Sequence, residues 1–336
     1  MSTIIEQSIW ITGVVIGLFI LYEGSKLISL GCVKIAQKSK YSRYVLGIFV
    51  VSTLAALPEV LITIFATNEF ARGGVDLAIG SLLGSHVVNI SFIVGIAAII
   101  KPIKTPGDII VRDGSFLVVT TLIGSVFIMD GQVSIIEGLV LLLIILPYLL
   151  TTVHTSKKSP DELKESIVKV ELELSLLGQI FGEKITAKIK KYSLLTLSAG
   201  IIISVISAKI VTDSTLQISE LFGIKSLILG VVFISVGASL PDIFAGYHAA
   251  KLGFPDLALG IGLGASLFTM LISLGIIGIV YHPFIEYSRY ISTILIMNFV
   301  IFLVFGFMLT ERNISRLEGV LLFTGYFVMV IGLFII

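Results

Sequence analysis

The sequence Leu57-Pro58-Glu59 lies inside a long apolar stretch, and Leu240-Pro241-Asp242 repeats its pattern in the second half of the chain. An acidic side chain at the centre of a bilayer costs about 2.5–3.5 kcal/mol, so it generally marks the path of an ion or a substrate. Two such acids, each beside a proline and in matching places, therefore predict a transporter built from two related halves with its site between them.

The composition is that of a helical membrane protein. Of the 336 residues, 56% are hydrophobic and 13% are charged, whereas a soluble domain has about 25% charged residues. Several apolar runs reach the roughly 20 residues that a helix needs to cross a bilayer, and they do not alternate as barrel strands would. The net charge of +1 and the single cysteine, Cys32, argue against a nucleic-acid partner and exclude an internal disulfide.

Ten membrane spans are expected, five in each half. Pro58 aligns with Pro241 at an offset of 183 residues, and Gly80 aligns with Gly260 at an offset of 180. An odd number of spans per copy inserts the second copy upside down. The predicted fold is an all-α polytopic membrane protein with two inverted five-helix repeats, in which helices 2 and 7 are broken at the prolines. The expected spans are residues 8–30, 43–69, 75–100, 113–130, 133–154, 192–213, 225–252, 254–280, 288–309 and 316–335.

Loop charges predict the orientation in the cell membrane. Loops after odd-numbered spans hold 18 lysine and arginine residues, and loops after even-numbered spans hold three. Because basic loops stay in the cytoplasm, both termini are expected outside. The predicted domains are a first repeat over 1–155, a cytoplasmic linker over 156–191 and a second repeat over 192–336. The linker is expected to be an amphipathic helix on the membrane surface, and a regulatory cation site there is the less favoured alternative.

Each proline should also expose backbone oxygen. Proline removes one helical hydrogen bond and displaces the carbonyl four residues earlier, which is that of Leu54 for Pro58 and that of Gly237 for Pro241. At membrane depth a freed carbonyl needs a partner, and a bound cation is one. A structural kink, with the acid paired elsewhere in the bundle, is the alternative interpretation of a single motif. The duplication favours an ion site.

Other oxygen-bearing side chains near the acids suit a hard cation. Ser85 and Asn89 are four residues apart and share one helix face, and Ser239 and Thr269 belong to the second copy. Ca²⁺ takes six to eight oxygen ligands from carboxylates, carbonyls and hydroxyls, and two carboxylates balance one divalent ion. Taken alone, the serine and asparagine are equally typical of packing contacts between membrane helices.

Three further polar residues are expected to be structural. His86 is predicted to form an interhelical hydrogen bond rather than to bind an ion. Lys26 and Lys209 occupy matching positions in spans one and six, where each has an acidic residue three or four positions away in the same helix. Local pairing of this kind is common on helices.

These residues give the chain its resemblance to the sodium/calcium exchanger family, within the cation/calcium antiporters. The resemblance covers two alpha-repeats, about 45–100 and 228–283. Its phrases are Leu57-Pro58-Glu59, Gly84-Ser85 with Asn89, and Gly237-Ala238-Ser239-Leu240-Pro241-Asp242 with Gly264. The resemblance implies four ion sites at mid-membrane, and alternating access in which spans one and six slide against the other eight.

Carried over position by position, the resemblance implies a specific ligand set and some departures from it. The chain has Ala56 and Ala265 where the family has hydroxyls, and Thr269 where an acid is frequent, so the usual three-for-one coupling is not implied. Ala55 would contribute through its backbone carbonyl. The implied metal-binding residues are Glu59, Asp242, Ser85, Asn89, Ser239, Thr269, Ala55 and Ala238.

The sequence therefore predicts a secondary antiporter that moves Ca²⁺ against Na⁺ or H⁺ by alternating access. It contains no nucleotide-binding motif, so an ion gradient is expected to drive transport. The expected partners are the lipid bilayer and the transported inorganic cations, with no other cofactor. The alternatives are an exchanger of another cation, such as Na⁺ for H⁺, a passive cation channel, and an intramembrane enzyme. The last is disfavoured because the four histidines are scattered along the chain.

Overall fold

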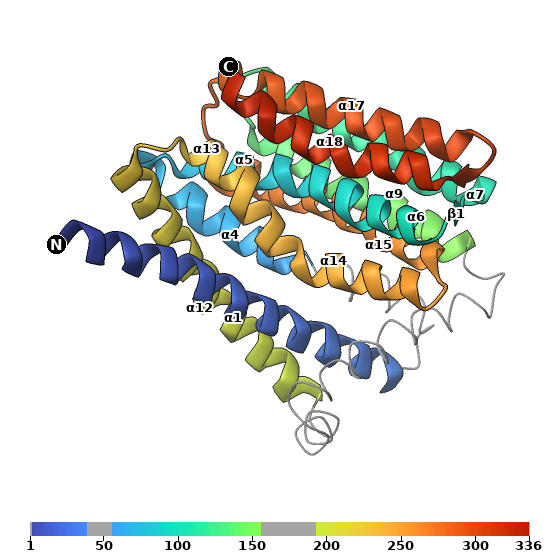
Figure 1. The fold of residues 1–336 in the computed structure, drawn as a ribbon, viewed down its shortest axis with the longest axis horizontal. Coiled ribbons are helices and arrows are strands. Elements are labelled where there is room, and N and C mark those ends of the chain that lie inside the picture. Colours follow the sequence, from blue (N-terminus) through green and yellow to red (C-terminus); the bar gives the residue numbers. More distant parts are fainter. Residues whose placement is uncertain (1, 39–55, 156–192, 336) are drawn as a thin grey trace.

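Helices make up nearly all of the computed structural model, which describes residues 2–38, 56–155 and 193–335 (Figure 1). The first half contains α1 (Ser2–Lys38), α4 (Leu57–Asn68), η2 (Phe70–Arg72), α5 (Gly74–Val88), η3 (Asn89–Val94), α6 (Gly95–Ile100), β1 (Ile103–Lys104), α7 (Gly107–Ile109), η4 (Ile110–Gly114), α8 (Ser115–Met129) and α9 (Ile135–Thr155). The second contains α12 (Ser193–Phe222), α13 (Ser226–Leu229), η6 (Gly230–Ile234), α14 (Ser235–Lys251), α15 (Pro255–Phe268), η7 (Thr269–Ser273), α16 (Leu274–Ile276), η8 (Ile277–Tyr281), η9 (Tyr287–Arg289), α17 (Ile291–Leu309), β2 (Asn313–Ile314) and α18 (Arg316–Ile335).

The helices fall at the ten predicted positions. Within the described residues, eight helices are long and apolar enough to cross a membrane, and two shorter apolar helices, Leu57–Asn68 and Ile135–Thr151, occupy the second and fifth places. α12 continues to Phe222, beyond the predicted end at 213, because Asp213 pairs with Lys209 one turn earlier at 2.7 Å and is therefore tolerated within the helix. The linker at 156–191 and the first part of the second span, with Ala55, lie outside the described residues.

Contacts between α1 and α12 occur in matching pairs. In one contact of a pair the glycine belongs to the first repeat, and in the other it belongs to the second. A Cβ atom built on Gly17 of α1 would lie 2.7 Å from Val211 of α12. A Cβ atom on Gly200 of α12 would lie 2.7 Å from the backbone nitrogen of Ile28 in α1. The offset of 183 converts one pair into the other. The helices run in opposite directions (Figure 1), as the inverted repeat requires.

At each end of the bundle, a loop of the first repeat pairs with a loop of the second repeat. β1 pairs antiparallel with β2, so that Ile103 lies opposite Ile314. Gln132 forms an isolated antiparallel bridge with Phe284. These contacts tie the loops of one repeat to the loops of the other.

The second proline motif lies inside a helix rather than between two helices. α14 runs through Pro241 without interruption, and a π-helical segment, Gly230–Ile234, precedes it. The break at this motif therefore consists of one missing backbone hydrogen bond rather than a gap in the helix. In the first motif, α4 begins at Leu57 with Pro58 in its first turn, where proline is tolerated because that amide has no helical partner.

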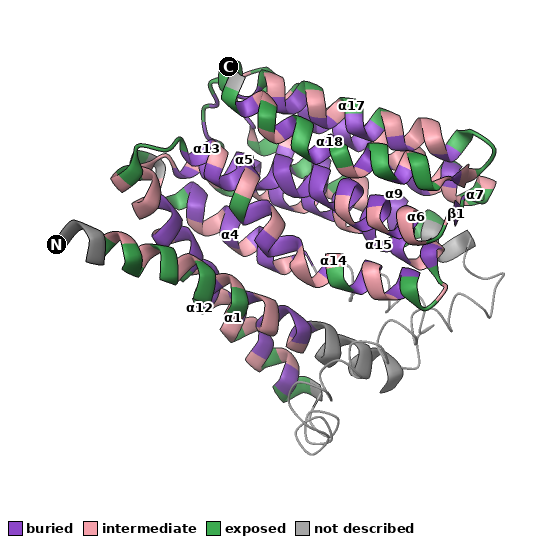
Figure 2. Cartoon of the chain, in the orientation of Figure 1, coloured by how far each residue is buried: buried purple, intermediate pink, exposed green. Residues whose placement is uncertain are grey.

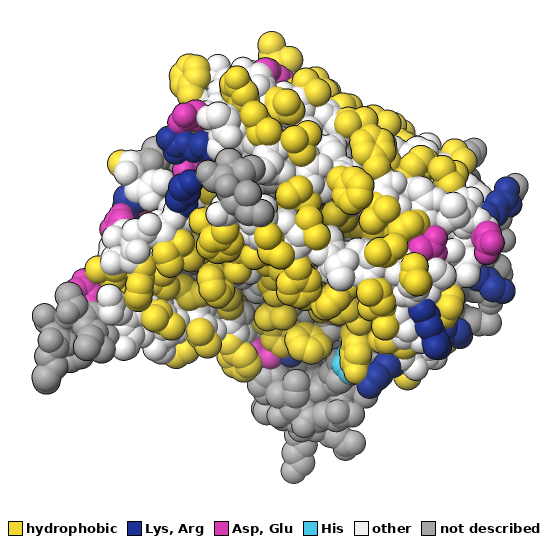
Figure 3. Space-filling view, turned by 45° about the horizontal axis from the view of Figure 1, so that its top comes forward, with side chains coloured by type: hydrophobic (Ala, Val, Ile, Leu, Met, Phe, Trp, Pro, Cys, Tyr) yellow, Lys and Arg dark blue, Asp and Glu magenta, His cyan; other side chains and the backbone are white. Residues whose placement is uncertain are grey.

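The surface is that of a protein in a bilayer. Figure 3 shows hydrophobic side chains covering the broad flank of the molecule, with charged side chains gathered toward its ends. Large apolar side chains such as Phe299 and Phe334 are 63% and 70% exposed. Buried residues concentrate in α4, α5, α14 and α15, the helices that surround the two acid-proline motifs, while α1, α17 and α18 carry many exposed positions (Figure 2).

Candidate functional site

Glu59 and Asp242 meet inside the protein. Glu59 lies in the first turn of α4, and Asp242 follows Pro241 in α14. Their side chains are buried, with 2% and 7% of the residue surface exposed, and the two carboxyl groups interact electrostatically. The Ser239 hydroxyl lies 3.5 Å from Oε1 of Glu59, to which it donates. The acids of the two repeats thus share one buried site.

Several buried polar atoms around this site lack hydrogen-bond partners. Among the described residues, Oε2 of Glu59, both side-chain polar atoms of Asn89 and Oγ1 of Thr269 have none. A buried polar group left without a partner costs about 1–3 kcal/mol, so a set of them is unusual unless something else binds there. The three oxygens are of the kind that hard cations prefer.

Two π-helical segments hold matching polar residues of the two repeats. Asn89 begins η3 and Thr269 begins η7, and the two residues are aligned at the offset of 180. η7 packs against both α4 and α5, which brings Thr269 to the helix of Glu59. Single π turns are frequent at functional sites because they redirect side chains locally. Sequence analysis did not predict these turns, and no residue pattern signals them.

Ser85 lies in the contact between α5 and α14. Ser85 is fully buried, and its hydroxyl is 3.4 Å from the carbonyl oxygen of Ser235. A Cβ atom on the adjacent Gly84 would lie 2.7 Å from Ser235, so the two helices approach closely here. Ala238 is buried one position before Ser239. In this conformation Ser85 therefore makes a packing contact.

α1 covers the second proline motif. A Cβ atom on Gly237 would lie 2.5 Å from Cδ1 of Leu18, so glycine is needed where α1 crosses α14. Pro241 lacks the amide hydrogen that would otherwise bond to the Gly237 carbonyl. The backbone oxygen freed by the proline thus belongs to a residue that α1 packs against.

His86 forms the predicted interhelical hydrogen bonds. Its Nδ1 lies 3.0 Å from the carbonyl oxygen of Ser266, and its Nε2 lies 2.8 Å from the Thr121 hydroxyl. Ser266 returns a hydrogen bond from its hydroxyl to the His86 carbonyl at 3.0 Å. Both ring nitrogens are therefore engaged in joining α5 to α8 and α15.

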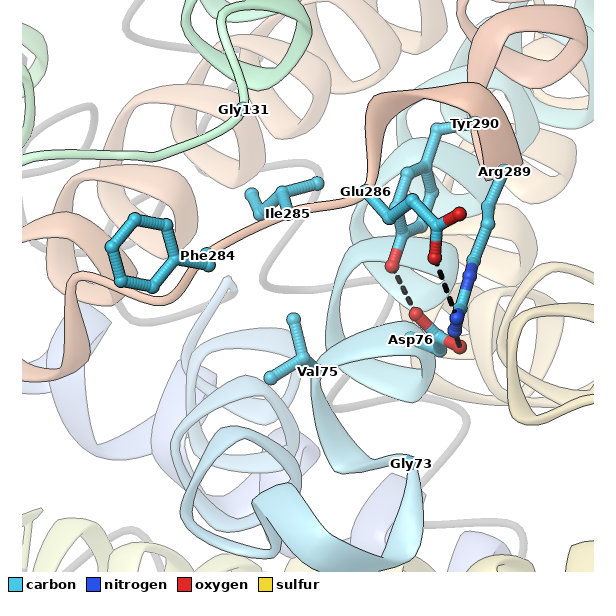
Figure 4. A pocket seen from close by; sticks show the side chains of 9 residues that line it. All are labelled: Gly73, Val75, Asp76, Gly131, Phe284, Ile285, Glu286, Arg289 and Tyr290. Atoms are coloured by element: carbon cyan, nitrogen blue, oxygen red, sulfur yellow. Dashed lines mark hydrogen bonds and ion pairs between the residues drawn. The ribbon is translucent and has the colours of Figure 1, made fainter.

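A surface pocket of about 500 Å³ lies at the end of the bundle that holds the N-terminus of α5 (Figure 4). Asp76, in the first turn of α5, accepts hydrogen bonds there from Arg289, at 3.0 Å, and from the Tyr290 hydroxyl. The charge of Asp76 raises the pKa of Arg289 above its usual value, and Arg289 also pairs with Glu286 at 2.6 Å. Asp76 thus fastens α5 to the start of α17, and the pocket lining includes neither Glu59 nor Asp242.

Comparison with known proteins identifies relatives along the whole chain. The family described as "Sodium/calcium exchanger protein" matches residues 9–153 and 192–335. The inner membrane protein YrbG of Escherichia coli is 28% identical and covers 85% of this chain and 84% of its own length. The sodium/calcium exchanger MaX1 of Methanosarcina acetivorans is 27% identical, and the alignment covers 96% of this chain and 97% of that protein.

The fold is also that of a solved exchanger. A structure of the sodium-calcium exchanger NCX_Mj superposes with a TM-score of 0.63 at 24% sequence identity, over 96% of this chain and 98% of the other. Because the family match extends over both inverted repeats, this chain belongs to the sodium/calcium exchanger family.

Proposed function

We propose that the protein is a secondary antiporter that exchanges Ca²⁺ for Na⁺ or H⁺ by alternating access, with its ion site between α4 and α14. The observation that carries the proposal is the buried pair Glu59 and Asp242 beside the unpartnered oxygens of Asn89 and Thr269. The name of the Methanosarcina acetivorans relative, a sodium/calcium exchanger, supports the choice of ions.

The charge and the oxygen ligands of the site suit one calcium ion. Two ionised carboxylates neutralise one divalent cation and supply up to four of the six to eight oxygens that Ca²⁺ takes. The side chains of Asn89, Ser239 and Thr269 would add three more. Ser85, Ala238 and Ala55 complete the proposed set, the alanines through backbone carbonyls. The ions are cargo, so each ligand has to release them as readily as it binds them.

Exchange of another cation pair, such as Na⁺ for H⁺, is the second candidate. Thr269 is neutral, and Ala265 lacks a side-chain oxygen. A site with two acids carries less negative charge than one with three, which weakens its hold on divalent ions relative to monovalent ones. Competition between Ca²⁺, Na⁺ and H⁺ for the same site separates the two candidates.

The proposed location is the cell membrane, with both termini outside and the 156–191 linker in the cytoplasm. The excess of basic residues in the loops after odd-numbered spans supports this orientation. The printed name of the Escherichia coli relative, an inner membrane protein, agrees with the location.

The test is Ca²⁺ flux into sealed vesicles that contain the purified protein. An imposed Na⁺ or H⁺ gradient should drive Ca²⁺ uptake, and Glu59→Gln or Asp242→Asn should strongly reduce it. Asp108→Asn is the matched control, because Asp108 is exposed and lies at the start of α7. Ca²⁺ flux that ignores both gradients would contradict exchange, and flux that neither site variant reduces would contradict the site.

A further inference from the structure

α1 and α12 form a two-helix unit on one side of the other helices (Figure 1). Small residues bring their backbones together along the crossing: Gly13 meets Ser214, Gly17 meets Val211, Gly24 meets Ser204, and Gly200 meets Ile28. Such close contacts favour movement of the two helices as one body. Because Leu18 of this unit packs on Gly237 in the helix of Asp242, opening the site requires the unit to shift against α14.

Ion pairs fasten this unit to the other helices at the end of the bundle where both chain termini lie. Nζ of Lys209 in α12 is 2.7 Å from Oδ1 of Asp213 in the same helix and 3.2 Å from Oε1 of Glu69, which ends α4. Nε of Arg72 is 2.8 Å from Oε1 of Glu220, near the end of α12. Two ion pairs therefore cross from α12 to the short segment that follows α4.

At the opposite end, the described residues form no equivalent arrangement. Lys26 of α1 holds the place that Lys209 holds in α12, but it pairs with Glu23 in its own helix at 2.7 Å and lies over the Tyr22 ring at 3.8 Å. No acidic residue occurs between 243 and 255, where α14 ends, and Lys251 stands there instead. The two repeats have similar folds, but the charged residues between the α1–α12 unit and the other helices differ at the two ends of the bundle.

We propose that Lys209–Glu69 and Arg72–Glu220 form a latch that sets the resting conformation of the exchanger. The latch holds the α1–α12 unit against α4 and keeps the site closed on the side of the chain termini. The part of the opposite side that the structure describes holds no such restraint, and that side opens more readily. This inference rests on the proposed function only in requiring that the site opens to the two sides in turn, whichever ions it carries.

The expected size of the effect follows from the exposure of the pairs. The side chains of Arg72 and Glu220 are 27% and 46% exposed, and those of Lys209 and Glu69 are 41% and 26% exposed. Pairs with this exposure change an equilibrium by a factor of about 1.5 to 5 each. Breaking both should therefore shift the ratio of the two open forms by about 2- to 25-fold, and high salt should weaken the latch because exposed charges are screened.

The test measures access to the site from each side of the membrane. In a Cys32→Ser background, which removes the single native cysteine, Ser239→Cys provides a reporter in the site. A membrane-impermeant thiol reagent is applied to one side of sealed vesicles at a time. Glu220→Gln and Lys209→Gln should each raise the labelling rate from the side of the termini about 1.5- to 5-fold and lower it from the other side. Arg72→Glu combined with Glu220→Arg should restore the parental rates.

Two comparisons make the result decisive. Glu23→Gln breaks the local pair of Lys26 and should leave labelling from the side of the termini unchanged. A variant that is merely loosened would label faster from both sides, whereas loss of a latch moves the two rates in opposite directions. Unchanged rates in both Glu220→Gln and Lys209→Gln, or equal rises on both sides, would overturn the latch. Neither outcome depends on ion flux, so the result is independent of whether Ca²⁺ is the cargo.

Discussion

The Ser239 hydroxyl of the second repeat lies 3.5 Å from Oε1 of Glu59 in the first repeat, and the two residues are 180 positions apart in the chain. This contact belongs to neither repeat alone. It places a hydroxyl donor on one oxygen of the carboxylate, while among the described residues the other oxygen has no partner. Glu59 is therefore held in position by one repeat and left with an oxygen available for binding.

Neutralising Glu59 should strongly reduce transport and stabilise the ion-free protein. Glu59→Gln removes the repulsion between two buried carboxyl groups, since like charges in a buried site disfavour each other. We expect flux to fall by about 10- to 150-fold, because each tenfold loss corresponds to about 1.4 kcal/mol and a buried charge-assisted contact is worth about 1.5–3 kcal/mol. The ion-free melting temperature should rise by a few degrees, and added Ca²⁺ should no longer raise it. A variant that loses flux and also melts earlier would indicate misfolding instead.

Removing the Thr269 hydroxyl should lower the affinity for Ca²⁺ and raise the stability of the ion-free protein. Thr269→Val keeps the side-chain shape and removes a buried hydroxyl that has no partner among the described residues. The free energy of unfolding without ions should rise by about 1 kcal/mol, the typical cost of an unsatisfied polar group, while the Ca²⁺ concentration for half-maximal flux should increase. Thr67→Val is the control, since the Thr67 hydroxyl already donates to the Thr63 carbonyl at 2.7 Å. An unchanged Ca²⁺ affinity would remove Thr269 from the ligand set.

A methyl group at Gly237 should disturb the packing of α1 over the site. Gly237→Ala places Cβ 2.5 Å from Leu18, so α1 has to move or Leu18 has to change rotamer. Ca²⁺ flux should drop several-fold, and Leu18→Ala should restore part of it in the double variant. Gly264→Ala serves as the comparison, because a Cβ atom there meets nothing within 4 Å. Equal losses in the two glycine variants would show that the effect is not due to this contact.

The Tyr290 contact should stabilise the protein only below the pH at which tyrosine ionises. Burial and the neighbouring Asp76 charge raise the pKa of Tyr290, so the folded protein favours the neutral phenol. Its contribution is fully present below about pH 10, the ordinary tyrosine value, and declines above it as the unfolded chain ionises first. Thermal unfolding from pH 7 to 11 should show a steeper loss of stability in the parent protein than in Tyr290→Phe. Parallel curves would show that Tyr290 does not contribute this pH dependence.

Much of the fold could be predicted because its main signals are local or repeated. Apolar runs gave the spans, and the doubled acid-proline phrase gave the inverted relation of the halves. The sixth span was predicted to end at 213, but α12 continues to Phe222, and the Lys209–Asp213 pair keeps the charges inside the helix. The uninterrupted path of α14 through Pro241 also differs from a full break.

The site was less predictable because its geometry depends on contacts across the chain. Asn89 and Thr269 begin π turns, and no propensity of their residues marks such turns. Lys209 pairs with Asp213 as expected, but its second contact, with Glu69, spans 140 positions and was not predicted. Sequence spacing reveals partners in the same helix, and only the assembled bundle reveals partners in a different one.

The exchanged contacts of Gly17 with Val211 and of Gly200 with Ile28 bear on how the molecule assembles. In each pair, a groove on one half accepts a side chain or backbone turn of the other. A newly inserted N-terminal half consequently has its grooves facing lipid until the C-terminal half arrives. Biogenesis therefore ends with a docking step between two membrane-embedded bodies, and the carboxylate pair comes into existence only at that step.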